Sequence, residues 1–136
     1  MIAVDTSGWL EYFFDGENAA VFAPFVEDTR YLVVPVICLY EVFKKVSMAA
    51  DETKALRAVA QMKLGRVVDV TEAAALSAAR ISLNYKIPMA DSLILAITWA
   101  EKAALWTQDE HFKDLPGVEY REKKPKLITG PAKPGY

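Results

Sequence analysis

Apolar and polar positions alternate along the chain in short blocks that predict strands and helices in turn. Five apolar or β-branched runs are typical of short buried strands: 2–4, 31–34, 66–70, 104–107 and 117–120. Helical spacing between them predicts helices at 8–14, 18–28, 36–48, 51–64, 72–85 and 89–103, and a helical turn at 109–112. This alternation favours an α/β fold, a three-layer sandwich with a central, mostly parallel sheet flanked by helices.

Local signals refine two of these helices. Thr6 and Ser7 supply side-chain oxygens that can cap the first helix. In the helix at 51–64, the residues Leu56, Val59 and Ala60 fall at helical spacing and are predicted to face the core.

Length and composition indicate a single domain. The chain has 136 residues, of which 53% are hydrophobic, enough to fill one core. We expect a folded domain over 1–123. From 124 to 136 prolines and glycines dominate, which predicts an irregular, basic C-terminal tail.

Several features favour a cytoplasmic protein without membrane association. No run approaches the roughly 18 apolar residues of a membrane helix, because Glu41 and Asp91 interrupt the best candidates. No basic segment leads into an apolar one at the N-terminus, so no secretory signal is expected. Cys38 is the only cysteine, which excludes an internal disulfide and fits a reducing compartment.

Charge is distributed unevenly. The formal net charge is -2, yet residues 121–136 carry five basic side chains against one acidic side chain, Glu122. Such a tail could contact phosphate, or it could simply be a solvated extension.

The usual catalytic motifs are absent. The sequence has no P-loop, no G-x-G-x-x-G, no C-x-x-C pair and no G-x-S-x-G elbow. His111 is the only histidine, which excludes a histidine-rich metal site. The candidate chemistry therefore rests on acidic residues.

Two acidic residues stand at positions where a solvated carboxylate is not expected. Asp5 ends an apolar strand, at the sheet edge where α/β folds bind ligands, although it could also be a helix cap. Glu41 lies in a helix that is apolar nearly all round, although an ion pair with Lys44 or Lys45 is an alternative.

Two further acidic residues complete a candidate cluster. Asp91 is followed along its helix by apolar neighbours, and Asp109 follows the strand at 104–107. If the sheet gathers all four carboxylates, each pair about 5 Å apart repels by about 3 kcal/mol at an effective dielectric of 20. A divalent cation with oxygen ligands, Mg²⁺ or Mn²⁺, would offset that repulsion, whereas zinc would want more nitrogen and sulfur ligands.

The segments that carry these residues resemble a known family. Residues Ile2–Ser7, Glu41 in a helix after the second strand, Ala90–Ala96 and Thr107–Phe112 are similar, in order and separation, to the motifs of PIN domains. The length and order resemble VapC-type toxins, the ribonuclease halves of toxin–antitoxin pairs. The likeness spans about 1–120.

This resemblance implies a function and a set of site residues. It implies Mg²⁺- or Mn²⁺-dependent endonucleolytic cleavage of RNA, a homodimer and a cognate antitoxin protein as partner. Carried over by position, the metal-binding and catalytic residues would be Asp5, Glu41, Asp91 and Asp109, with Ser7 and Thr107 as polar supports. The resemblance assigns His111 no role.

Three alternatives stay open at this stage. A phospho-receiver signalling module is also an α/β protein with acidic residues, but it would want a paired acidic motif after the first strand. A PIN-type nuclease could instead serve RNA maturation or decay. The acidic pocket could also belong to a domain that only binds.

Overall fold

A parallel sheet forms the centre of the computed structural model, which describes residues 1–124. All strand pairs in this range are parallel, in the order β3-β2-β1-β4-β5. The strands are β1 (Ile2–Val4), β2 (Leu32–Pro35), β3 (Arg66–Val68), β4 (Ala104–Thr107) and β5 (Val118–Tyr120). The predicted α/β fold is confirmed, while the predicted tail at 124–136 falls outside the described residues apart from Lys124.

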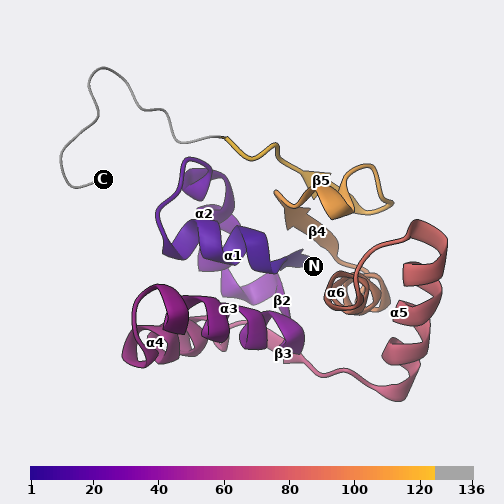
Figure 1. Cartoon of the computed structure of the whole chain (residues 1–136), viewed down its shortest axis with the longest axis horizontal. Coiled ribbons are helices and arrows are strands. Elements are labelled where there is room, and N and C mark those ends of the chain that lie inside the picture. The colour runs from indigo at the N-terminus through magenta and orange to yellow at the C-terminus, as the bar shows by residue number, and fades with distance from the viewer. Residues whose placement is uncertain (125–136) are drawn as a thin grey trace.

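Helices cover both faces of this sheet. They are α1 (Thr6–Phe13), α2 (Ala19–Glu27), α3 (Val36–Ala49), α4 (Glu52–Met62), α5 (Glu72–Tyr85) and α6 (Met89–Ala100), with 3₁₀ turns η1 (Thr29–Tyr31) and η2 (Glu110–Phe112). In Figure 1, α1 to α4 lie to the left of the strands and α5 and α6 to the right. No helix within 1–124 is long and apolar enough to cross a membrane.

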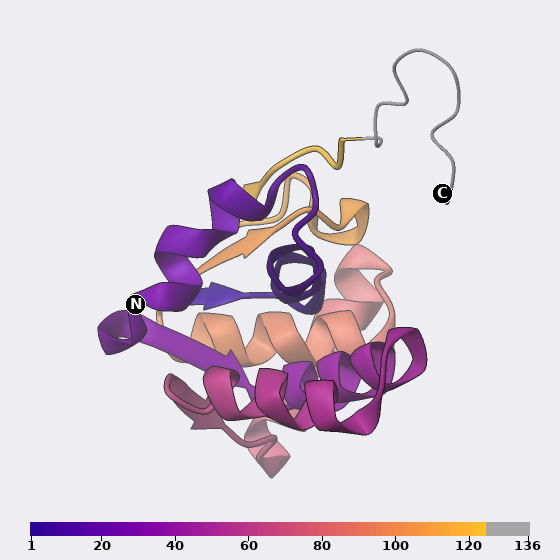
Figure 2. The same cartoon turned by 90° about the vertical axis from the view of Figure 1, so that its left-hand side faces the viewer.

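The strand order makes β1 the point where the chain changes direction across the sheet. From β1 the chain adds β2 and β3 on one side, then crosses back to add β4 and β5 on the other. Open α/β sheets bind ligands at the carboxyl ends of strands at such a switch point. Because Val4 pairs with Trp106, the residues that follow β1 and β4 emerge side by side (Figure 2).

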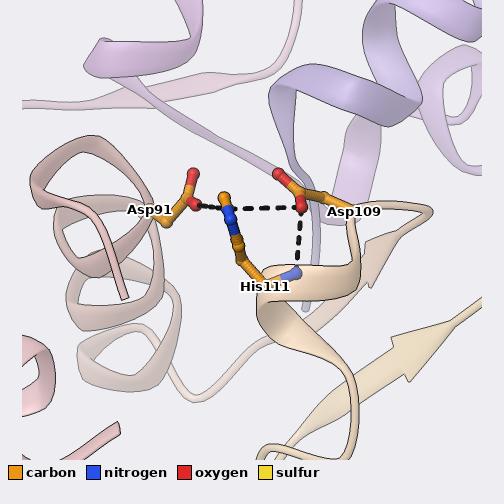
Figure 3. A group of neighbouring side chains, drawn as sticks. All are labelled: Asp91, Asp109 and His111. Atoms are coloured by element: carbon orange, nitrogen blue, oxygen red, sulfur yellow. Dashed lines mark hydrogen bonds and ion pairs between the residues drawn. The ribbon is translucent and has the colours of Figure 1, made fainter. Parts of the chain in front are cut away.

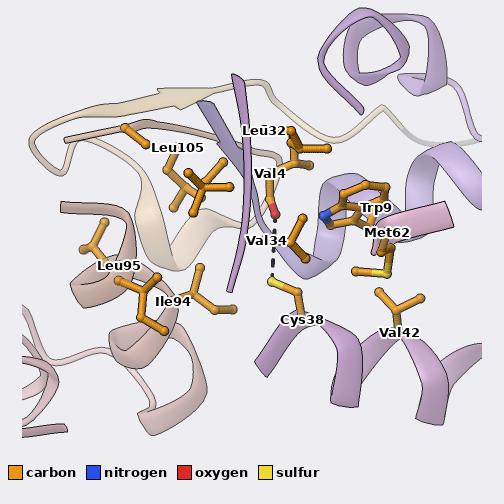
Figure 4. Packing of buried hydrophobic residues seen from close by; sticks show 14 of the residues in the cluster. Val4, Trp9, Leu32, Val34, Cys38, Val42, Met62, Ile94, Leu95 and Leu105 are labelled. Carbon is orange, nitrogen blue, oxygen red and sulfur yellow. Dashed lines mark hydrogen bonds between the residues drawn. The ribbon is translucent and has the colours of Figure 1, made fainter. Parts of the chain in front are cut away.

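The core fills the space between the sheet and both helical layers (Figure 4). Val4 and Leu105 from adjacent strands are fully buried, as are Ile94 from α6 and Cys38 from α3. The Cys38 thiol donates to the backbone oxygen of Val4 at 3.8 Å, which ties α3 to the end of β1. Trp9 is also fully buried, so its indole belongs to the core and cannot stack on a nucleobase.

Of the three capping residues that the sequence offered for the first helix, Asp5 is the cap, and Thr6 and Ser7 are not. α1 begins at Thr6, and the capping oxygen is Oδ1 of Asp5, which accepts from the Gly8 amide at 3.1 Å. Thr6 and Ser7 lie inside the first turn instead. Both hydroxyls are therefore free to contact carboxylates, Thr6 with Glu41 and Ser7 with Asp5.

The predicted buried face of α4 is wrong. The residues that α4 buries are Ala55, Ala58 and Met62, while the side chain of Leu56 is 55% exposed. Small alanine side chains allow α4 to pack closely on α3. The spacing of apolar residues alone could not show which of two neighbouring faces of α4 is buried.

Gly8 provides the tightest contact between α1 and the sheet, and it generates a stability prediction. A Cβ at Gly8 would lie 2.5 Å from Cγ1 of Val4 and 2.9 Å from Cδ1 of Phe22, both fully buried. Alanine normally stabilises a helix interior by about 1 kcal/mol over glycine. Here overpacking dominates, so Gly8→Ala lowers the free energy of unfolding by about 1–2 kcal/mol in urea denaturation.

The matched control is Thr53→Ala in α4, whose side chain is exposed. This change raises helix propensity without a packing cost, so its free energy of unfolding should equal or slightly exceed that of the wild type. A Gly8→Ala variant as stable as the Thr53→Ala variant would contradict the close approach.

Candidate metal centre

The four predicted acidic residues all lie toward the carboxyl edge of the sheet. Asp5 follows β1 directly, and Asp109 follows β4 after Gln108. Asp91 lies in the first turn of α6, and Glu41 in the second turn of α3, next to the first residue of α1. Elements far apart in sequence thus converge on one region.

Asp5 is the most buried of the four, with 2% of its surface exposed. Ser7 Oγ donates to its two carboxylate oxygens at 2.8 and 3.0 Å, and the Gly8 amide donates to Oδ1 at 3.1 Å. Burial raises the pKa of Asp5 to about 7, against the opposing effect of the hydrogen bonds from Ser7 and Gly8. Burial therefore disfavours the ionised form of Asp5, and a positive charge nearby would stabilise it.

Ser7 and Thr107 connect Asp5 with the end of β4. Ser7 Oγ accepts from the Gln108 amide at 3.2 Å and lies 3.4 Å from Thr107 Oγ1. Thr107 Oγ1 in turn accepts from the Asp109 amide at 2.9 Å. These two hydroxyls join the first turn of α1 to the backbone after β4, and their role as polar supports of a metal site stays a prediction.

Glu41 is held by α1. Its Oε1 accepts from Thr6 Oγ1 at 2.6 Å. No ion pair found within residues 1–124 involves Glu41, and Lys44 lies over the Tyr40 ring instead, with Nζ 5.9 Å from the centroid. The alternative of an ion pair with Lys44 or Lys45 is therefore not observed.

The tightest group in the region consists of Asp91, Asp109 and His111 (Figure 3). His111 Nδ1 lies 2.7 Å from Asp91 Oδ2 and 3.4 Å from Asp109 Oδ1. The pKa of Asp91 is raised by burial and then by the charge of Asp109, while the hydrogen bond with His111 lowers it. The same hydrogen bond raises the pKa of His111.

His111 is the site residue that sequence reasoning missed. Its position two residues after Asp109 in a single helical turn could have signalled that its side chain turns back toward that carboxylate. The Asp109 side chain caps this turn by accepting from the His111 amide at 2.9 Å. The contact with Asp91, twenty positions earlier, depends on how α6 packs beside β4 and has no local signal.

Three of the four acidic residues lie close enough to the buried thiol of Cys38 to change its pKa. Burial raises the pKa of Cys38 well above its usual value, and the negative charges of Asp5, Glu41 and Asp91 raise it further. Three carboxylates thus act on one sulfur atom. Asp5 and Glu41 nevertheless lie outside the tight group of Asp91, Asp109 and His111 in the described structure.

The donor set fits a divalent cation. One oxygen from Asp91, one from Asp109 and a ring nitrogen of His111 all lie within 4.8 Å of one another. Carboxylate oxygens suit Mg²⁺ and Mn²⁺, and the raised pKa values of Asp5 and Asp91 show where positive charge would stabilise the ionised forms. A hollow of about 380 Å³ opens beside the group, lined by Ser7, Gln108, Asp109, Glu110, His111 and Lys123.

Solved structures share this fold. A toxin–antitoxin complex from Klebsiella pneumoniae aligns with a TM-score of 0.72 at 19% identity, covering 88% of this chain and 96% of that one. DNA-bound VapBC from Salmonella typhimurium gives 0.69 at 17%, covering 90% and 98%. VapC20 from Mycobacterium tuberculosis, a Sarcin-Ricin loop cleaving toxin, gives 0.69 at 16%, covering 82% and 92%.

Sequence comparison gives the family. No curated protein sequence matches the chain. The family model described as the PIN domain, however, matches residues 2–118, which is nearly all of the described structure. The chain therefore belongs to the PIN domain family.

Proposed function

We propose that this chain is a metal-dependent endoribonuclease, the toxin of a VapBC-type toxin–antitoxin pair. PIN domains are nucleases. The observation that carries the proposal is the Asp91–Asp109–His111 group, which lies near the buried Asp5 at the switch point of the sheet. Membership of the PIN family also favours this reading over the phospho-receiver alternative.

Each acidic side chain has a part in the proposed reaction. Bound Mg²⁺ or Mn²⁺ would lower the pKa of a water molecule and polarise a phosphoryl oxygen of RNA. Asp91 and Asp109 would hold the ion, with Asp5 ligating directly or through water from its buried position. Glu41, oriented by Thr6, would position or deprotonate the attacking water through its second oxygen.

Electrostatics supports the need for a cation. The carboxyl of Asp5 is desolvated, and Asp91 is desolvated and close to the charge of Asp109. Of the ion pairs found within 1–124, the only ones that involve these carboxylates are those of His111 with Asp91 and Asp109. A divalent ion would supply the missing positive charge at neutral pH.

The proposed partners follow from the structural neighbours. The Salmonella typhimurium and Klebsiella pneumoniae proteins are in complexes with their antitoxins, and VapC20 cleaves the Sarcin-Ricin loop. By analogy we propose an RNA substrate, a cognate antitoxin and a homodimer for this chain. Lys123 lines the hollow beside Asp109 and His111, where its ammonium could contact a substrate phosphate.

Removing one metal-binding carboxylate should abolish cleavage. With Mg²⁺ or Mn²⁺ and a panel of structured RNAs, the Asp5→Asn and Asp91→Asn variants should each cut at least about 100-fold more slowly than the wild type. The measurement is the rate of product formation on denaturing gels, with EDTA added to parallel samples.

Asp28→Asn is the matched control for this experiment. Asp28 lies before β2, at the opposite edge of the sheet, and its ion pair with Arg30 is exposed to solvent, so the pair contributes little to stability. Its cleavage rate should equal that of the wild type. Full activity in both purified Asp5 and Asp91 variants would refute the assignment.

The buried Asp5 should make the metal-free protein less stable as the pH rises. Its pKa is about 7 in the fold and about 3.9 in an unfolded chain, so the folded state binds the extra proton between these values. Stability from this group is present below about pH 4 and lost as the pH rises through 7. Asparagine can keep the cap at Gly8 without carrying charge.

Thermal melting in EDTA measures this effect. Asp5→Asn should melt above the wild type at pH 8, and the difference should disappear toward pH 4. Adding Mg²⁺ or Mn²⁺ at pH 8 should raise the melting temperature of the wild type more than that of the variant. A difference between the two proteins that does not change with pH would show that Asp5 ionises normally.

A toxin should also arrest growth. Induced expression of the wild type in a bacterial host is expected to stop growth, while equal expression of Asp91→Asn is not. Colony counts after induction give the readout, with protein levels compared by immunoblot. Unimpaired growth with active wild-type protein present would favour the alternative nuclease of RNA maturation or decay.

A further inference from the structure

We infer that His111 is a nitrogen ligand of the metal ion and that it biases the site toward Mn²⁺ over Mg²⁺. The inference rests on the proposed function, in which Asp91 and Asp109 hold a divalent ion. It differs from the acidic set predicted from the sequence, because the chain's only imidazole enters the coordination sphere.

The geometry already places Nδ1 at a ligand position. Metal–ligand bonds of about 2.1 Å put adjacent ligands of an octahedral ion about 3 Å apart. His111 Nδ1 lies 2.7 Å from Asp91 Oδ2 and 3.4 Å from Asp109 Oδ1, on either side of that spacing. Small side-chain rotations would therefore suffice to put an ion between the three atoms.

The backbone keeps His111 at this position. Its amide donates to Asp109 Oδ1 at 2.9 Å, and the next residue, Phe112, is fully buried. The imidazole side chain itself is 56% exposed, whereas that of Asp91 is 14% exposed. His111 would thus coordinate from the solvent side, with the acidic ligands on the protein side.

Coordination requires that Nδ1 of His111 present a lone pair, and not a proton, to the ion. In the metal-free contact Nδ1 lies 2.7 Å from Asp91 Oδ2, and an ionised carboxylate only accepts, so Nδ1 would carry the proton there. When the Nδ1 lone pair binds the ion, that proton leaves Nδ1 and Nε2 carries the ring proton instead, so the imidazole stays neutral.

A nitrogen donor changes which ion the site prefers. Mg²⁺ favours oxygen ligands and loses water reluctantly, whereas imidazole suits first-row transition ions, among which Mn²⁺ also accepts carboxylates. A site with two carboxylates and one imidazole should therefore bind Mn²⁺ more tightly than an all-oxygen site would, with little gain for Mg²⁺.

Pulsed electron paramagnetic resonance tests the bond directly. The untagged full-length protein is expressed in cells supplied with ¹⁵N-histidine, purified and loaded with Mn²⁺ alone. Since His111 is the only histidine, any ¹⁵N coupling to the bound ion comes from this side chain. We expect an imidazole coupling in the wild type and none in His111→Gln.

Binding titrations give the second readout. His111→Gln should weaken Mn²⁺ binding about tenfold and change Mg²⁺ binding much less. The size is expected because loss of a residue that only hydrogen-bonds to a metal ligand already lowers affinity about tenfold or more. Glu110→Gln, in the same turn and exposed, is the control. It alters nearby charge, so it should affect both ions alike and keep the ¹⁵N coupling.

The outcomes separate this inference from the proposed function. Bound Mn²⁺ without ¹⁵N coupling would overturn the role of His111 and leave the acidic site intact. Mn²⁺ binding that survives Asp91→Asn undiminished would overturn both. A loss of Mn²⁺ and Mg²⁺ affinity by equal factors in His111→Gln would also refute the selectivity.

Discussion

Crowding of carboxylates at one edge of a parallel sheet is the constraint on which this structure depends. Asp5 is buried directly after the strand at the switch point, and Asp91 and Asp109 approach within reach of a single imidazole. Burial raises the pKa of Asp5 to about 7 against the hydrogen bonds that lower it, so ionising this carboxyl in the metal-free fold costs free energy. A cation bound at this edge would stabilise the ionised side chains.

The surrounding contacts hold these carboxylates in place. Asp5 caps α1 through the Gly8 amide, and the lack of a side chain at Gly8 lets α1 approach Val4 closely. Ser7 and Thr107 then join the first turn of α1 to the end of β4 through hydroxyl contacts. Since the same residues end strands, begin helices and contact the site, a change at one of them affects stability and chemistry together.

The sequence predicted the order and type of the strands and helices because their apolar periods are clear and glycine, proline and acidic residues separate them. It failed where two neighbouring arcs of a helix are both apolar, as in α4, where Ala55 and not Leu56 faces the core. It left the first cap undecided, because Asp5, Thr6 and Ser7 are all good capping residues and only the backbone path selects among them. Strand ends indicated the places of Asp5 and Asp109, whereas Glu41 and Asp91 were singled out by the apolar residues around them in their helices.

His111 shows why a site is harder to predict than a fold. A lone histidine in a short turn carries no periodic signal, and its contact with Asp91 exists only because α6 begins beside the end of β4. The family resemblance did not supply it either, since that resemblance rests on acidic positions. A likeness of fold at 16–19% identity concerns the sheet and helices and does not specify this side chain. Metal preference can therefore differ between PIN domains through one side chain at the solvent side of the acidic group, without change in the sheet that gathers the carboxylates.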